Sequence, residues 1–130
     1  MKVAIFTDAY LPYISGVVTA VDNQSNALAE RGHEIRIFCP DYKDIEKVHN
    51  LHENIKIIRL PATFEFPFYE GFDIAFPTAL KSIKKVKKFK PDIIHAQTEG
   101  GVGWEGFVCS KLFNLPLIST FHTFLGDPEY

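Results

Sequence analysis

The sequence has few of the features that mark secreted or membrane-spanning proteins. It has only two cysteines, Cys39 and Cys109, each within an apolar run and without a CxxC spacing. We therefore expect two reduced, buried thiols in a reducing compartment. No apolar run approaches the roughly 20 residues that a membrane span requires. The apolar stretch between Lys2 and Asp8 is also too short for a signal peptide.

The chain also has no overall excess of positive charge. Its formal net charge is −2, which argues against a nucleic-acid partner. The average hides an asymmetry, because six of the fourteen basic residues lie between Lys81 and Lys90. We expect a cytoplasmic protein in which any contact with a membrane is peripheral.

Strand and helix patterns alternate along the 130 residues, which suffice for one globular domain. Short apolar runs without polar alternation are typical of strands covered on both faces. Such runs occur at 2–7, 34–39, 54–60, 92–96 and 115–121. Helical patterns lie at about 17–31, 78–89 and 103–113, the last with Trp104, Phe107, Val108 and Leu112 facing inward. This alternation predicts an α/β fold, a parallel sheet with helices on both faces.

Residues 61–77 fit neither pattern. The segment holds three prolines and six aromatic residues, so it is too proline-rich for a central strand and too apolar for a solvated loop. The lysine-rich helix that follows has one apolar face, and its other residues are mostly lysine. We expect either a solvated helix face or attraction to anionic lipid headgroups, worth about 1 kcal/mol per lysine near the surface. The membrane candidates are Lys81, Lys84, Lys85, Lys87 and Lys88.

The connection DAYLPYISG after the first strand is a candidate ligand loop. Ser15 can cap the following helix, and Gly16 allows another group to approach the backbone closely. The amino terminus of a helix attracts anions, above all phosphate. A capped loop whose aromatic residues merely cover the end of the sheet remains the alternative.

A second candidate is GVGWEG at 101–106, which has the GxGxxG spacing of a dinucleotide-binding turn. That fingerprint normally follows the first strand of its unit, with an acidic residue ending the next strand. Here the next strand leads instead to His122. Three interpretations stay open: a cofactor site, a glycine-rich turn that lines a different ligand, and tight packing of helix against strand.

The histidines predict no metal site. His122 and Thr123 follow a buried strand and either face a ligand crevice or bond to neighbouring backbone. His95 is expected to be structural. The remaining histidines lie on the expected surface without metal-ligand spacing.

Taken in order, FTDAYLPYISGVVTAV, LAERGHEIRIFCP, RLP, KPDIIHAQTEG and PLISTFHTF resemble family 4 retaining glycosyltransferases of the GT-B fold. Within that family the sequence is most similar to bacterial diacylglycerol glucosyltransferases. The resemblance implies that residues 1–130 form the N-terminal, acceptor-side Rossmann-like domain of a longer enzyme. The nucleotide-sugar-binding domain would then be absent, so the 130-residue chain alone is expected to be inactive.

The resemblance also implies a reaction, the transfer of a hexose from a nucleotide sugar with retention at the anomeric carbon. The expected donor is UDP-glucose, and the acceptor a lipid such as diacylglycerol at the inner face of the cell membrane. No tightly bound cofactor is expected, and a requirement for Mg²⁺ is left open. A soluble acceptor is the first alternative. An oxidoreductase or binding module that uses GVGWEG is the second.

Particular residues acquire expected roles from the resemblance. Gly16, with Ser15, would bind the donor diphosphate, and His122 would be catalytic and face the donor sugar. The acceptor side of the cleft would be lined by Asp8, Tyr10, Glu99, Gly100 and Thr123. A leaving diphosphate that helps to deprotonate the acceptor needs electrostatic stabilisation more than a strong side-chain base. This would explain why no pair of carboxylates of the glycosidase kind stands out.

Overall fold

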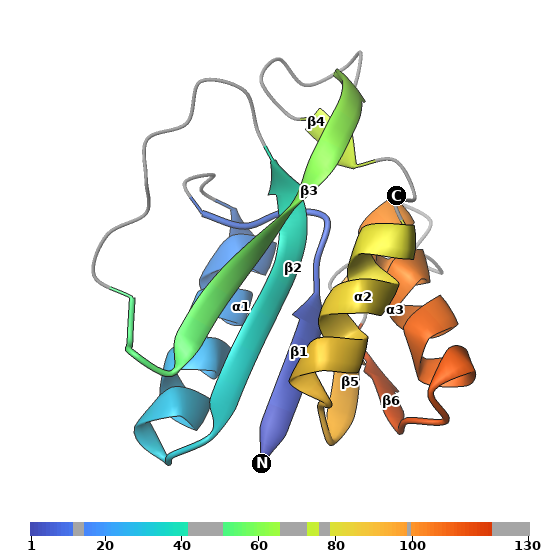
Figure 1. The fold of residues 1–130 in the computed structure, drawn as a ribbon. Helices are drawn as coiled ribbons and strands as arrows, with labels where there is room; N and C mark the ends of the chain where they lie inside the picture. Colours follow the sequence, from blue (N-terminus) through green and yellow to red (C-terminus); the bar gives the residue numbers. More distant parts are fainter. Residues whose placement is uncertain (12–14, 42–50, 66–72, 76–78, 99, 121–130) are drawn as a thin grey trace, which may run out of the picture.

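A single twisted sheet with helices on both faces makes up the fold (Figure 1). The computed structural model describes residues 1–11, 15–41, 51–65, 73–75, 79–98 and 100–120. The elements are β1 Lys2–Phe6, α1 Gly16–Glu30, β2 Glu34–Asp41, β3 Ile55–Glu65, β4 Asp73–Ala75, α2 Ala79–Phe89, β5 Ile93–Ala96, α3 Gly101–Leu112 and β6 Leu117–Ser119. The strand order is β4-β3-β2-β1-β5-β6. All pairs are parallel except β3 with β4, so the predicted α/β fold with a parallel sheet is confirmed.

Two strands run further than the sequence predicts. β2 continues through Pro40, and β3 continues through Pro61 to Glu65, where it pairs antiparallel with the edge strand β4. Proline removes one backbone donor but its fixed φ is compatible with extended backbone. A proline near the carboxyl end of a strand therefore need not stop it. The segment 61–77 thus supplies the end of β3 and the edge strand β4, not a central strand.

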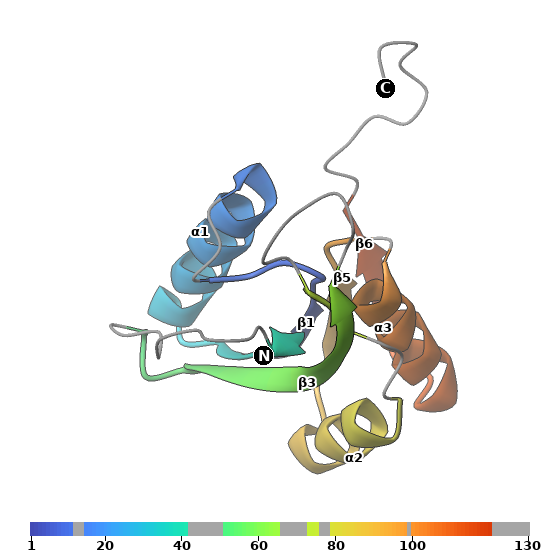
Figure 2. The same cartoon turned by 90° about the horizontal axis from the view of Figure 1, so that it is seen from above.

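The sheet separates two hydrophobic cores. Figure 2 shows α1 on one side of the sheet and α2 and α3 on the other. Alternate residues of a strand point to opposite faces, so Ile5 packs with the α1 core and Phe6 with the core beneath α2 and α3. The Phe6 ring stacks on Phe38 of β2, with centroids 4.3 Å apart.

The prediction for the inward face of α3 is wrong. Its four large apolar side chains, which are Trp104, Phe107, Val108 and Leu112, are 61%, 38%, 41% and 58% exposed. The buried face consists instead of Val102 and small or polar residues, among them Gly106, Cys109 and Ser110. A Cβ on Gly106 would lie 2.9 Å from Cγ of Phe6. Because the helix approaches the sheet this closely, small residues and not large ones face inward.

The two cysteines behave as predicted. Cys39 and Cys109 are free thiols, and both are buried, one on each side of the sheet. Burial raises the pKa of each thiol to about 12. Both groups are therefore protonated at neutral pH and unreactive as nucleophiles.

Candidate functional site

The strands that follow β1 in the sequence lie on both sides of it in the sheet, which makes β1 the switch point of the topology. β2 and β3 lie on one side of β1, and β5 and β6 lie on the other. In open parallel sheets, ligands bind outside the carboxyl ends of the strands at such a point. Here the loop after β1 and the loop after β5 meet, because the backbone N–H of Asp8 donates to Oγ1 of Thr98 at 2.9 Å. These two loops form the candidate site.

Ser15 and Gly16 begin α1 at the same carboxyl end of the parallel strands. Ser15 is the N-cap: its Oγ accepts from the backbone N–H of Val18 at 3.2 Å, so the predicted cap is confirmed. Gly16 is exposed, and a Cβ built on it would meet nothing within 4 Å. Packing within the described structure therefore does not require a glycine at this position.

The carboxylate of Asp8 is directed at α3. Its Oδ1 accepts from the backbone N–H of Val102 at 2.9 Å and its Oδ2 from that of Gly103 at 3.5 Å, while the Thr98 hydroxyl also donates to Oδ2. A carboxylate at a helix amino terminus is stabilised both by these bonds and by the helix dipole. Asp8 therefore lies at the switch point, where its carboxylate binds α3 and the loop after β5.

The glycines around α3 serve this close packing. A Cβ on Gly100 would lie 2.5 Å from Oδ2 of Asp8, and one on Gly103 would lie 1.9 Å from the carbonyl oxygen of Thr98. The position that a dinucleotide pyrophosphate would take at the helix terminus is occupied by the Asp8 carboxylate. Of the three interpretations of GVGWEG, the geometry supports tight packing and argues against a cofactor turn.

Removing the Asp8 carboxylate should destabilise the protein. We expect Asp8→Ala to lower the free energy of unfolding by about 2 kcal/mol, since a cap and a charge-assisted hydrogen bond are lost together. Urea denaturation measures this. Asp8→Asn is the matched control, because its amide oxygen can still accept from Val102, and it should recover part of the loss. Equal stability of Asp8→Ala and the wild type would contradict this capping role.

Tyr10 does not line the cleft as predicted. Its side chain is fully buried in the α1 core, and its hydroxyl donates to Oδ1 of Asp22 at 3.2 Å. Burial, with the neighbouring Asp22 carboxylate, raises the pKa of the Tyr10 hydroxyl well above its usual value. The hydroxyl is therefore a neutral donor that fastens the loop after β1 to α1.

Sequence reasoning missed a series of hydrogen-bonded polar side chains that begins at the end of β5. Nε2 of Gln97 donates to Oε1 of Gln24 in α1 at 2.8 Å and lies 3.3 Å from Nδ1 of His95. Nε2 of His95 lies 2.6 Å from Oγ1 of Thr120. This arrangement agrees with the structural role expected for His95. The available signal was the polar Gln-Thr pair directly after an apolar strand.

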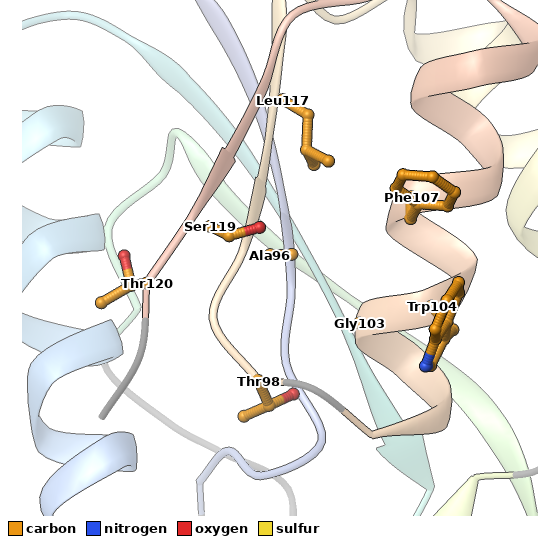
Figure 3. A pocket seen from close by; sticks show the side chains of 8 residues that line it. All are labelled: Ala96, Thr98, Gly103, Trp104, Phe107, Leu117, Ser119 and Thr120. Carbon is orange, nitrogen blue, oxygen red and sulfur yellow. The ribbon is translucent and has the colours of Figure 1, made fainter. Parts of the chain in front are cut away.

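A small cavity of about 180 Å³ lies between α3 and β6 (Figure 3). Its lining residues are Ala96, Thr98, Gly103, Trp104, Phe107, Leu117, Ser119 and Thr120. The Trp104 and Phe107 rings meet edge to face, with centroids 5.4 Å apart. None of the lining side chains titrates, so the cavity offers apolar surface and hydroxyl groups but no acid or base.

The remaining predicted site residues, Glu99, His122 and Thr123, lie outside the described residues. Within the part of the chain that the structure describes, no group of three or more histidine, cysteine, aspartate or glutamate side chains could hold a metal ion. The same part contains no helix that is long and apolar enough to cross a membrane.

The doubly covered parallel sheet and its switch-point loops define a Rossmann-like domain. Residues 14–129 match Glycosyltransferase Family 4, and the chain belongs to this family. The solved structures that it resembles include a glycosyltransferase from Rickettsia africae and sucrose-phosphate synthase from Thermosynechococcus elongatus. The first has a TM-score of 0.62 at 21% identity and the second 0.62 at 18%, over 98% and 94% of this chain. These neighbours support the GT-B type of fold.

Among curated proteins, the chain is similar to two alpha-monoglucosyldiacylglycerol synthases. It is 34% identical to that of Streptococcus pneumoniae and 32% identical to that of Acholeplasma laidlawii, over 98% of this chain in each case. It is 25% identical to a GDP-mannose-dependent alpha-mannosyltransferase of Mycobacterium tuberculosis over 95% of its length. The chain spans only 28%, 31% and 32% of these relatives and 31% and 33% of the two structures.

Proposed function

We propose that the complete protein transfers glucose from UDP-glucose to a membrane lipid such as diacylglycerol, with retention of the anomeric configuration. Residues 1–130 form its N-terminal, acceptor-side domain, and a nucleotide-sugar-binding domain lies outside them. The observation that carries the proposal is the open space over Gly16 at the capped amino terminus of α1. The names of the two synthases support the choice of sugar and lipid.

The affinity for a diphosphate at the amino terminus of α1 follows from the helix backbone. The first turn of a helix presents N–H groups and a partial positive charge to an anion, and no acidic residue occupies the first turn of α1. The donor diphosphate approaches Gly16 here and takes the space that a side chain at this position would fill. His122 faces the donor sugar, and Glu99 and Thr123 contribute to the acceptor side. Asp8 holds the two loops together and does not contact the acceptor.

The lysines of α2 support contact with an anionic surface. Val86 and Phe89 are buried, while the five candidate lysines, which are Lys81, Lys84, Lys85, Lys87 and Lys88, are all exposed. Lys85 and Lys88 also border a groove of about 540 Å³, whose lining includes three further basic residues, Lys2, Arg36 and Lys56, and one acid, Glu34. Such a surface attracts anionic phospholipid. The protein then works as a peripheral enzyme at the cytoplasmic face of the membrane.

The test uses the complete protein, radiolabelled UDP-glucose and diacylglycerol in anionic vesicles. Label in the organic extract would support lipid glucosylation, and the 130-residue chain alone should produce none. Label in a water-soluble product, with none in the extract, would replace the lipid by a soluble acceptor. Absence of turnover with UDP-glucose, and with GDP-mannose as a second donor, would overturn the proposal.

A further inference from the structure

Arg59 joins three separate parts of the fold through one guanidinium group. It lies on β3 directly opposite Cys39 of β2. Its Nη1 donates to the carbonyl oxygen of Pro40 at 3.1 Å and approaches Sγ of Cys39 at 3.3 Å. Its Nη2 donates to the carbonyl oxygen of Leu11 at 2.7 Å. The side chain thus connects β3, the end of β2 and the loop after β1.

This connection requires the planar fork of an arginine. The two Nη atoms serve carbonyl groups on different segments at the same time, and both bonds are charge-assisted. A lysine ammonium at the same position would keep the charge but lacks the fixed fork that reaches both carbonyl groups. A half-buried charged residue on a strand is unusual unless it is paired or hydrogen-bonded. The bonds to the Leu11 and Pro40 carbonyls account for its position.

The loop after β1 is consequently fastened at two adjacent residues. The Tyr10 hydroxyl bonds to Asp22 of α1, and the Leu11 carbonyl bonds to Arg59 of β3. Ser15 and Gly16 follow only four and five residues later, where the diphosphate site is proposed. Since only three residues separate Leu11 from the N-cap Ser15 in the sequence, a change in the placement of Leu11 is expected to alter where the chain enters α1.

We propose that Arg59 is a positioning residue for the nucleotide-sugar donor: by holding the Leu11 carbonyl, it sets the approach of the loop to the amino terminus of α1. This inference rests on the proposed function. Arg59 itself does not contact the diphosphate. Its effect passes through the backbone of the loop.

The test compares Arg59→Lys and Arg59→Ala in the complete protein, at a temperature where each variant is folded. Arg59→Ala should raise KM for UDP-glucose about tenfold with a smaller change in kcat, because ground-state and transition-state binding of the donor are weakened together. Arg59→Lys should lie between this variant and the wild type. Added guanidinium ion at millimolar concentration should lower KM again in Arg59→Ala and leave the wild type unchanged.

Arg36→Ala is the matched control. Arg36 is also a strand arginine, but its guanidinium lies 4.4 Å from the centroid of the Phe89 ring, on the face covered by α2. Its removal subtracts the same charge and, because Arg36 borders the groove proposed to face the membrane, should weaken vesicle binding. KM for UDP-glucose, measured on vesicle-bound enzyme, should nevertheless not rise. An equal rise of KM in both variants, or no rise in Arg59→Ala, would overturn the inference.

A second readout separates this inference from the proposed function. The backbone N–H groups of Val18 and Thr19 bond to Ser15 at the start of α1. Their hydrogen exchange should be faster in Arg59→Ala than in Arg36→Ala. If the complete protein turns over no nucleotide sugar, the proposed function fails, and exchange still decides whether Arg59 holds the loop. Equal exchange in the two variants would overturn its positioning role.

Discussion

His122→Ala should lower the rate of glucosyl transfer by the complete protein about 10²- to 10³-fold, the usual effect of removing one preorganised polar group from a reaction centre. The proposed role places the imidazole beside the donor sugar, past the carboxyl end of β6. There, charge develops as the bond to the diphosphate breaks. Organic-phase label from UDP-glucose measures the rate, and thermal unfolding of the same variant measures its stability.

The control for this prediction is a second histidine, His33, at the amino-terminal end of the strands. Nδ1 of His33 lies 3.0 Å from the amino group of Met1, on the amino-terminal side of the strands. His33→Ala should therefore leave the transfer rate unchanged. If His122 instead bonds to neighbouring backbone in a purely structural role, His122→Ala will lose thermal stability, and the folded fraction will retain its activity. That result would remove His122 from the catalytic site.

The order of strands and helices was predictable because parallel strands covered on both faces leave continuous apolar runs. The strand ends at Pro40 and Pro61 were not. The apolar runs in the sequence end just before each proline, whereas the structure shows both prolines inside paired strands. What decides such a case is whether the missing N–H was needed, and this depends on neighbouring strands that lie far away in sequence.

The face of α3 was mispredicted for a related reason. A stripe of large apolar residues normally marks the buried side of a helix. In α3, close contact with the sheet and with the loop after β5 leaves room only for small residues, and Trp104 and Leu112 remain largely exposed. Local periodicity reports apolar spacing, but it does not report the distance between helix and sheet.

Within the candidate site, the local interaction was predictable and the distant ones were not. The Ser15 cap joins residues three apart, so the sequence displays it. The partners of Asp8 lie 90 or more residues away, and Arg59 bonds to Leu11 across 48 residues. From the sequence, a carboxylate after a strand is a candidate ligand-binding group. Only the fold shows that the Asp8 carboxylate binds the amino terminus of α3.

Glycine spacing alone did not distinguish a glycine required for packing from one required for ligand binding. The space around each glycine helps to separate the two. Gly103 fits a nucleotide-binding motif, yet Thr98 already fills the space that its side chain would need. Gly16 belongs to no strict motif, yet the space beside it is open. A glycine that the fold does not require is the better candidate for one that a ligand requires.

This contrast gives the last prediction. Substitution of Gly16 should leave the fold intact and impair donor use, with kcat/KM for UDP-glucose falling about tenfold in Gly16→Ala and about a hundredfold in Gly16→Val. These losses correspond to about 1.4 and 2.7 kcal/mol of lost diphosphate binding. Stability should be unchanged or higher in Gly16→Ala, because alanine is favoured over glycine in a helix by up to about 1 kcal/mol.

Gly32, just beyond the other end of α1, provides the opposite control. Its φ is +89°, so Gly32→Ala should lower the free energy of unfolding by about 1 kcal/mol or more through backbone strain. It should leave kcat/KM unchanged for the folded enzyme. The two glycines at opposite ends of α1 would then have separate purposes: Gly32 allows the backbone conformation, and Gly16 leaves space for the ligand. Unchanged kcat/KM in Gly16→Val would show that no diphosphate approaches this terminus, and the donor site would have to lie elsewhere.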